Sequence, residues 1–346
     1  MKKRVIIIIF FVLIIAVCFF GYCYLISPVD SNNKETVVFE IKDGESSIEI
    51  ADSLKKEKLI KSKYFFLLLY KLENSKIKFT TYELNRSMNV YEILDTISTG
   101  NGINTNLVNI TLKEGDTIKN FSKEISDKTG NSYTEVIAVF NDKTFIKKMI
   151  DKYWFLDDSL LSNNLYYPLE GYIVPDTYEI NSKSSIEDII IKLLNESDKK
   201  FASYKNIENF KDIVILSSIV EKEAITIEDK KEVAGVFYNR IASNMNLGSD
   251  VTVYYGLQLD MSNDLTSEQI NSVNAYNTRL PEMRGKLPIG AVCNPSVETI
   301  NATIDYSKND YLYFVADKNG KVYYSKTLNE HNNTISKIKR EGLWIW

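Results

Sequence analysis

The sequence predicts a mixed α+β fold behind an N-terminal membrane-spanning helix. Three observations support this prediction: a long uncharged apolar run near the start, two similar strand-turn-helix patterns in the front half, and interleaved helical and strand-like segments in the rear half. The chain has 346 residues, of which 44% are hydrophobic and 25% charged, as in globular proteins with two or three folded units. We therefore expect an anchor, small α+β modules and a larger mixed helical and β domain.

Residues 5–26 form an uncharged apolar run that is long enough to cross a bilayer as a helix. Residues 1–4 include three basic side chains, which predicts a cytoplasmic stub and places the rest of the chain outside the membrane. A cleaved signal peptide would have a shorter apolar core and a small-residue cleavage site, and no convincing site is present. We expect a retained single-pass anchor in the lipid bilayer of the cell membrane, followed by a polar tether at residues 27–35.

The front half contains one local pattern twice. Ile41–Gly44 and Leu112–Gly115 each place an acidic residue and a glycine after a strand-like run, and a hydroxyl residue that can cap a helix follows. Residues 61–72 are apolar on nearly every side and predict a buried helix. Two copies are too few for a solenoid, so we expect a small module at residues 36–106 and a second strand-helix module at residues 107–160. Chance similarity between two common patterns is the alternative.

Residues 161–346 are expected to form one mixed helical and β domain. Two prolines and a glycine lie among the aromatic residues of Tyr166–Ile180, which predicts a rigid extended segment with a turn. Helices dominate as far as about residue 243, and short strands are expected afterwards, including residues 248–256. Asp317–Gly320 predicts the turn of a hairpin, and an amphipathic helix follows it.

Composition excludes several classes of function. The net charge of −4 argues against a nucleic-acid partner held by phosphate neutralisation. His331 is the single histidine, which excludes zinc sites with several imidazoles. Since no second ligand or nucleophile motif accompanies it, we expect His331 at the surface or at a helix end. The three cysteines suggest no disulfide framework. No metal site and no cofactor are expected.

Two glutamates lie in the apolar helix expected at residues 213–225. Glu221 and Glu223 are two positions apart, so they do not face each other on the helix. An ionised carboxylate is costly to bury, so each glutamate must keep its proton, which suits a general acid, or form an ion pair. Helical periodicity does not choose between the two glutamates. The candidate partners for an ion pair are Lys222, Lys230, Lys231 and Arg240.

Seven motifs follow one another in a characteristic order. They are "LEGYIVPDTYEI", "SSIVEKEA", "KKEVAGVFYNRI", "GSDVTVYYG", "AYNTR", "LPIGAVCNPS" and "YLYFVADKNGKVYYSKTLNEHNN". Together they resemble the YceG-like endolytic murein transglycosylases, over about residues 165–335. Residues 36–106 resemble the LysM-like module of that family more loosely.

The resemblance implies that the outer domain, at residues 161–346, cleaves MurNAc-GlcNAc bonds within peptidoglycan glycan strands and leaves 1,6-anhydro-MurNAc ends. It also implies that peptidoglycan synthases at the membrane are partners and that no cofactor is used. Glu221, the first glutamate of "VEKE", matches the catalytic general acid and base of the family. Glu223, Glu170 and Tyr178 are expected to support it.

One carboxyl group is sufficient for this chemistry. Hydrolytic glycosidases usually use two carboxyl groups, but a transglycosylase can use the 6-hydroxyl of the muramyl sugar as an internal nucleophile. The same glutamate then gives its proton to the glycosidic oxygen and takes a proton from that hydroxyl. The resemblance suggests that the following residues bind the substrate: Asn239, Ser249, Asp250, Thr252, Tyr254, Tyr276, Asn277 and Thr278.

Four positions and one turn differ from the pattern of the family. The turn reads "GKLPIGAV" where the family has Gly-Leu-Pro-Pro-Gly-Pro-Ile. Gly248 replaces a glutamine, Val251 a proline and Arg279 a tyrosine, and Val322 lies where a histidine is common. These changes fall at polar cleft positions of the family. The alternative hypothesis is therefore a catalytically weakened paralogue that acts as a peptidoglycan-binding or scaffold protein.

Overall fold

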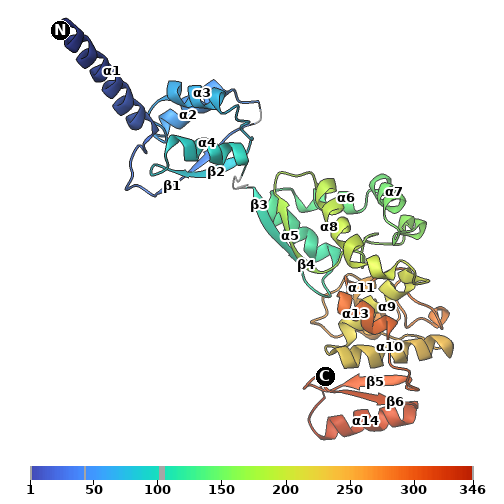
Figure 1. Cartoon of the computed structure of the whole chain (residues 1–346). Coiled ribbons are helices and arrows are strands. Elements are labelled where there is room, and N and C mark those ends of the chain that lie inside the picture. Colours follow the sequence, from blue (N-terminus) through green and yellow to red (C-terminus); the bar gives the residue numbers. More distant parts are fainter. Residues whose placement is uncertain (1, 43, 101–105, 345–346) are drawn as a thin grey trace. The chain divides into compact units, whose positions relative to one another are not determined.

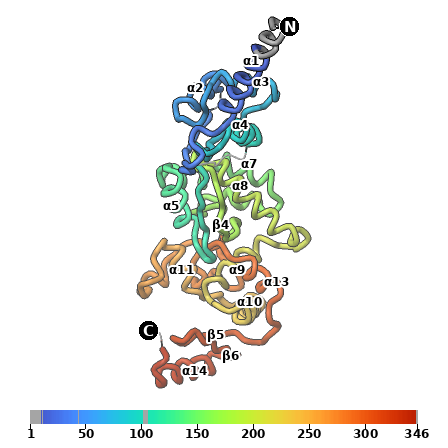
Figure 2. Tube along the Cα trace, turned by 60° about the vertical axis from the view of Figure 1, so that its left-hand side comes forward, coloured from blue at the N-terminus to red at the C-terminus, as the bar shows by residue number. Residues whose placement is uncertain are grey.

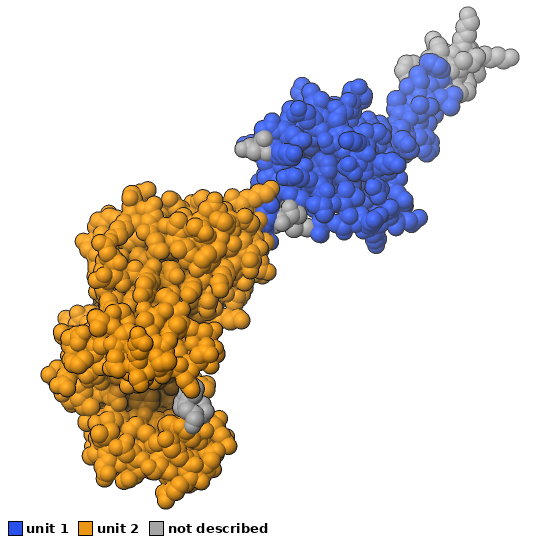
Figure 3. Space-filling view, turned by 180° about the vertical axis from the view of Figure 1, so that it is seen from behind, with its two compact units in different colours: residues 1–107 blue, residues 108–346 orange. Residues whose placement is uncertain are grey.

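The computed structural model describes residues 2–42, 44–100 and 106–344 (Figure 1). Met1 of the predicted stub and Asp43 of the first predicted turn lie outside these ranges. The chain divides into two compact units, residues 1–107 and residues 108–346 (Figure 3).

Unit 1 is a two-stranded sheet covered by short helices. Its elements are α1 (Lys2–Ile26), β1 (Thr36–Glu40), α2 (Ser47–Lys56), α3 (Lys63–Leu72), β2 (Thr81–Asn85) and α4 (Val90–Thr99). The strands are antiparallel, with Thr36 opposite Asn85 and Glu40 opposite Thr81. Ser46 and Asn89 cap α2 and α4 in capping boxes, as hydroxyl and amide side chains do before a helix. The strand predicted before Ile41–Gly44 and the helix predicted after it are thus confirmed.

Residues 61–72 were expected to form a helix that is buried on every side, and that prediction is wrong in part. The helix exists as α3, and Phe66 and Leu69 are buried. Tyr64 and Leu72, however, are 75% and 70% exposed. The physical reason is that α3 packs mainly on α2 and α4, which leaves part of its surface exposed.

The apolar N-terminal run is helical in the structure, as α1. Among the residues that the structure describes, none of the helices is both long and apolar enough for a membrane crossing. The predicted single-pass anchor at residues 5–26 is therefore not confirmed.

Unit 2 consists of three layers that follow one another along the chain (Figures 1 and 2). The first contains β3 (Leu107–Leu112), α5 (Ile118–Thr129), α6 (Tyr133–Phe140), α7 (Lys143–Lys152), η1 (Asp158–Leu161), β4 (Asp176–Asn181), α8 (Ile186–Lys200) and η2 (Ala202–Tyr204). The second contains α9 (Phe210–Glu223), α10 (Ile227–Ala242), α11 (Asp250–Gly256), α12 (Ser267–Ile270), η3 (Pro281–Met283) and α13 (Val297–Ile304). The third contains β5 (Tyr313–Ala316), β6 (Val322–Ser325) and α14 (Leu328–Arg340).

The first layer crosses the module boundary predicted at residue 160. β3 pairs with β4, which lies after that boundary, and a continuous buried core joins residues such as Ile110, Phe140 and Ile190. A two-stranded sheet needs both strands, so residues 107–160 do not fold apart from the segment that follows them.

The segment at residues 248–256 was expected to be a strand, and that prediction is wrong. It forms the helix α11 after an extended Ser249. Every residue from Val251 to Tyr255 is buried. A short run that is buried on all sides has no alternating pattern, and such a run does not distinguish a strand from a buried helix.

The hairpin predicted around Asp317–Gly320 is confirmed. β5 and β6 are antiparallel, with Tyr313 opposite Ser325 and Ala316 opposite Val322. The Asp317 carboxylate accepts hydrogen bonds from the backbone N–H groups of Asn319 and Lys321, at 2.9 and 3.1 Å, and so fixes the turn. α14 packs on both strands and gives the third layer its own helix.

Gly171 provides a test of the packing between layers. It has φ of +88°, and a Cβ added there would lie 2.6 Å from Ala291 Cβ and 2.9 Å from Val214 Cγ1. We expect Gly171→Ala to lower the free energy of unfolding by about 2–4 kcal/mol, because left-handed strain and overpacking add. The matched control is Gly130→Ala, which has φ of +75° but nothing within 4 Å, so it should cost only about 1–2 kcal/mol. Equal losses in urea titrations would contradict the packing argument.

Candidate functional site

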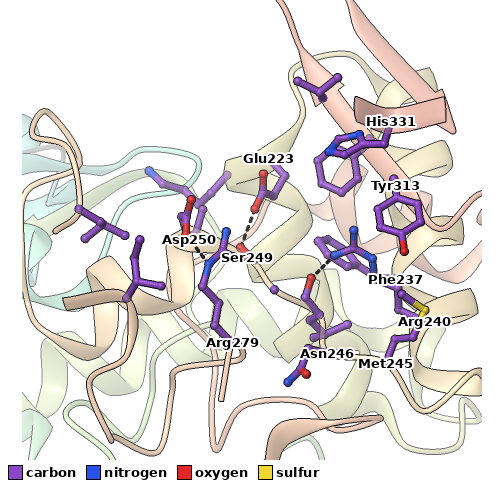
Figure 4. Close-up of a pocket in the computed structure, with 18 of the residues that line it drawn as sticks. Glu223, Phe237, Arg240, Met245, Asn246, Ser249, Asp250, Arg279, Tyr313 and His331 are labelled. Atoms are coloured by element: carbon purple, nitrogen blue, oxygen red, sulfur yellow. Dashed lines mark hydrogen bonds and ion pairs between the residues drawn. The ribbon is translucent and has the colours of Figure 1, made fainter. Parts of the chain in front are cut away.

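A large cleft lies in unit 2 between the second layer and the β5–β6–α14 layer. It has a volume of about 1140 Å³ and is lined by residues of α9, α10, α11, β5 and α14 and by the segment 244–249. Figure 3 shows unit 2 hollowed at this level, and Figure 4 shows the side chains in the cleft. Glutamate, aspartate, arginine, asparagine, tyrosine and histidine side chains all contribute to its wall. The cleft is therefore large enough and polar enough for a chain of sugar units.

Glu223 is the last residue of α9, and its side chain lines this cleft (Figure 4). Its carboxyl group accepts a hydrogen bond of 2.5 Å from Ser249 Oγ. Burial raises the pKa of Glu223, and the negative charge of Asp250 raises it further. The Ser249 hydrogen bond and the positive charges of Arg240 and Arg279 lower that pKa without cancelling the rise. Glu223 is thus a carboxyl group with a raised pKa at a cleft wall, which is what a general acid needs.

Glu221 is held in a different environment, two residues earlier on the same helix. Its carboxylate lies 2.8 Å from Lys230 Nζ, and both side chains are only 6% exposed. It also accepts hydrogen bonds of 2.9 Å from the backbone N–H and the hydroxyl of Ser296, and one from Thr299 Oγ1. Burial opposes the charged form, but the bonds from Lys230, Thr299 and Ser296 prevail and lower the pKa of Glu221. Glu221 is an ionised partner in a buried ion pair and is not among the residues that line the cleft.

The prediction that Glu221 keeps its proton beside a sugar-binding groove is therefore wrong. The physical reason is Lys230, which reaches the carboxylate from the next helix. Glu223, expected as the supporting residue, lines the cleft and has the raised pKa that had been assigned to Glu221.

Three of the eight predicted substrate-binding residues line the cleft, namely Ser249, Asp250 and Tyr254. Asp250 carries an ion pair to Arg279, with 2.5 Å between Oδ1 and Nε. Thr252 and Thr278 are fully buried behind Ser249. Thr252 Oγ1 donates to the Ser249 carbonyl at 2.7 Å, and the Ser249 N–H donates to Thr278 Oγ1 at 3.3 Å. These two threonines hold the residue that bonds to Glu223, and the structure gives them no place on the cleft wall.

The remaining predicted substrate-binding residues, Asn239, Tyr276 and Asn277, have structural contacts instead. Asn239 Nδ2 donates to the carbonyls of Asn309 and Tyr311, at 3.0 and 2.9 Å, and so ties α10 to the segment before β5. Tyr276 is buried, and its ring stacks on an aromatic neighbour. Asn277 is also buried and donates to two backbone carbonyls of its own loop. These contacts do not place the three side chains on the cleft wall, and their predicted role in substrate binding stays a prediction.

Glu170 and Tyr178 were expected to support the catalytic residue, and neither lines the cleft of Glu223. Glu170 is buried, and burial raises its pKa to about 8. Its carboxyl group accepts hydrogen bonds from Asn294 Nδ2, Tyr255 Oη and the Ile118 N–H, at 2.7, 3.0 and 2.9 Å. The Tyr178 hydroxyl donates to a backbone carbonyl four residues earlier. Both stabilise the fold around the first layer.

Three charged or aromatic groups of the cleft were not predicted as site residues. Arg240 donates from Nε to the Leu312 carbonyl at 2.6 Å and lies 5.5 Å from the centre of the Tyr313 ring. His331 lies in the first turn of α14, as expected for a helix-end residue, but its ring stacks on Tyr313 and lines the cleft. Burial and the charge of Arg240 lower the pKa of His331. Arg279 was noted only as a departure from the family. Their places depend on how the hairpin docks, for which the sequence carries no local signal.

No group of three or more histidine, cysteine, aspartate or glutamate side chains is arranged to hold a metal ion within the described ranges.

The chain is a mixed α+β protein with a polar cleft and one partly buried acidic group at its wall, which is the arrangement of an acid-base site. It belongs to the YceG-like family, whose sequence model matches residues 39–337. The family resemblance found in the motifs is thus confirmed.

Relatives and a solved structure agree with this membership. The endolytic murein transglycosylase of Streptococcus pneumoniae (strain D39) is 31% identical over 354 residues, which cover 95% of this chain and 64% of the relative. That of Bacillus subtilis (strain 168) is 33% identical over 324 residues, which cover 90% of this chain and 88% of the relative. A YceG-like protein from Listeria monocytogenes has a crystal structure that matches with a TM-score of 0.61 and 31% identity, over 87% of this chain and 99% of that one. The chain spans 64% of the length of the streptococcal relative.

The buried ion pair of Glu221 predicts a large effect on stability. Glu221→Gln leaves Lys230 buried without its anion, so we expect the free energy of unfolding at neutral pH to fall by about 3–5 kcal/mol. Adding Lys230→Met should restore part of this loss. Because the folded-state pKa of Glu221 is lowered, its contribution is complete above the unfolded pKa of about 4.3 and is lost as the pH falls below it.

The control for this experiment is an exposed ion pair from α10. Lys231 Nζ lies 2.6 Å from Asp305, whose side chain is 82% exposed. Asp305→Asn should cost far less stability than Glu221→Gln, because water screens an exposed pair. Urea titrations that follow the unfolding of unit 2 measure both losses of stability. If Glu221→Gln loses as little stability as Asp305→Asn, the buried ion pair contributes little.

Proposed function

We propose that this chain is a lytic transglycosylase that cleaves MurNAc-GlcNAc bonds within peptidoglycan strands, with Glu223 as the general acid and base. The single observation that carries the proposal is the raised pKa of a carboxyl group at the wall of a cleft of about 1140 Å³. Membership of the YceG-like family and the names of the streptococcal and Bacillus relatives support the choice of substrate.

The proposed reaction begins with proton transfer from Glu223. Its carboxylic acid protonates the glycosidic oxygen between C1 of MurNAc and C4 of GlcNAc, and the C1–O bond breaks. The 6-hydroxyl of the same MurNAc attacks C1 and gives its proton to the Glu223 carboxylate. The products are a free 4-hydroxyl on GlcNAc and a 1,6-anhydro-MurNAc end, and no water is consumed. Attack within one sugar has a high effective molarity, so a second carboxylate is not required.

Neighbouring groups orient the carboxyl group of Glu223 and line the space beside it. The Ser249 hydroxyl donates to the carboxyl group at 2.5 Å and orients it. Asp250, the residue after Ser249, forms an ion pair with Arg279 at 2.5 Å. Tyr254, Tyr313 and Trp344 line the same cleft and add aromatic surface to its wall. The site thus combines a carboxyl group of raised pKa with aromatic and polar walls.

The differences from the family do not remove this acid. Gly248, Val251 and Arg279 line the cleft, whereas Val322 lies on β6 and is not among the lining residues. The alternative of a peptidoglycan-binding or scaffold protein without activity remains a separate hypothesis, and product analysis distinguishes it. Membrane attachment through residues 5–26, synthase partners and a LysM-like role for residues 36–106 stay predictions from the sequence.

Replacement of Glu223 tests the proposal directly. Glu223→Gln keeps the size of the side chain but removes the acid, so we expect the rate of anhydro-end formation to fall by about 10²–10⁴-fold. Mass spectrometry of the products from purified glycan strands measures the effect. Glu208→Gln, a carboxylate removed from the segment before α9, is the control and should keep full activity. Wild-type activity in Glu223→Gln would refute the role of Glu223, and release of hydrolysed rather than anhydro ends would refute the lyase mechanism.

The pH profile gives a second test with a defined sign. A general acid acts while protonated, so the alkaline limb of the profile of kcat/KM follows the pKa of Glu223. Asp250→Asn removes a charge that raises this pKa and should move the limb to lower pH. Arg279→Gln removes a charge that lowers the pKa and should move the limb to higher pH. Shifts in the same direction for both variants would contradict the assignment.

A further inference from the structure

A second cleft adjoins the first in unit 2. It has a volume of about 410 Å³ and lies between the start of α5 and α11. Lys222, Val251, Tyr254 and Met261 line both clefts, so the two spaces share a wall. Lys222 immediately precedes Glu223, and the second cleft therefore begins beside the acid of the first.

Three lysines line the second cleft, namely Lys119 and Lys123 from α5 and Lys222 from α9. Lys222 Nζ donates to the Gly115 carbonyl at 3.3 Å, which holds its ammonium group at the border of the two clefts. In the part of the chain that the structure describes, no ion pair includes any of these lysines. The cleft therefore presents cations without a carboxylate partner.

Two aspartates also line the second cleft, and among the described residues neither forms an ion pair with these lysines. Asp116 accepts a hydrogen bond from Asn120 Nδ2 at 3.0 Å, and Asp260 accepts one from the Ser262 N–H at 2.8 Å. Both carboxylates are thus engaged within their own loops. Three lysines against two aspartates leave a positive balance, which favours an anionic ligand.

We propose that the second cleft binds the acidic stem peptide of the MurNAc unit next to the bond that is cut. This inference rests on the proposed function, because the glycan strand must occupy the first cleft. Each MurNAc carries its peptide through the lactyl group at O3, and the peptide has free carboxylates. A strand in the first cleft would bring such a peptide to the lysines that begin beside Glu223. The second cleft would then make the enzyme prefer strands that carry peptides over strands without them.

The test compares glycan strands that carry stem peptides with strands of the same length from which an amidase has removed them. For each protein we take the kcat/KM for peptide-bearing strands divided by the kcat/KM for stripped strands. In the variant Lys119→Gln/Lys123→Gln, we expect this ratio to fall about tenfold, because two contacts between charged groups are lost. The matched control is Lys128→Gln/Lys148→Gln, which removes the same charge from positions outside both clefts. The control should keep the wild-type ratio. An unchanged ratio in the first variant would overturn the inference.

A binding experiment separates this inference from the proposed chemistry. In a Glu223→Gln background, peptide-bearing strands should bind about tenfold more tightly than stripped strands, and the two lysine substitutions on α5 should abolish the difference. Equal binding of both strands would overturn the role of the second cleft even if the wild-type protein cuts glycan. Tighter binding of peptide-bearing strands by a protein that cuts neither substrate would support the cleft and refute the enzymatic proposal. Inorganic phosphate is added as a competitor. If it displaces peptide-bearing and stripped strands equally, the lysines bind phosphate groups and not the peptide, and the inference is overturned.

Discussion

The site depends on one constraint, the cost of placing two carboxyl groups at the end of a buried helix. α9 is buried from Val214 to Val220, so neither Glu221 nor Glu223 can reach bulk water freely. The two glutamates offset this desolvation cost with different partners. Glu221 gains a lysine and three further hydrogen-bond donors, whereas Glu223 gains one neutral hydroxyl. The two pKa values are thereby moved in opposite directions, and this separation defines which group can give up a proton at the cleft.

The ion pair of Glu221 also positions Glu223. Lys230 comes from α10, and Ser296 and Thr299 come from the start of α13, so the Glu221 carboxylate joins three helices. This junction fixes the last turn of α9, and the side chain of Glu223 is directed toward the cleft from that turn. The structural glutamate and the proposed catalytic glutamate are therefore two parts of one arrangement.

The cleft itself is assembled from segments that are distant in the sequence. Ser249 is held against Glu223 by Thr252 and Thr278, while the opposite wall comes from Tyr313 and His331 of the last layer (Figure 4). The lysines of α5 reach the same region from the first layer. All three layers of unit 2 therefore contribute residues to the two adjoining clefts.

The sequence by itself determined the strands of unit 1, the hairpin of β5 and β6, the family, and the fact that each buried glutamate must be protonated or paired. It did not determine which glutamate takes which state. Helical periodicity gives the direction of a side chain on its own helix, but pKa depends on neighbours from elsewhere in the fold. Lys230 follows Glu221 on another helix, and Ser249 reaches Glu223 from a separate segment. Only the tertiary structure brings those partners together, and their charge and hydrogen bonds decide the roles.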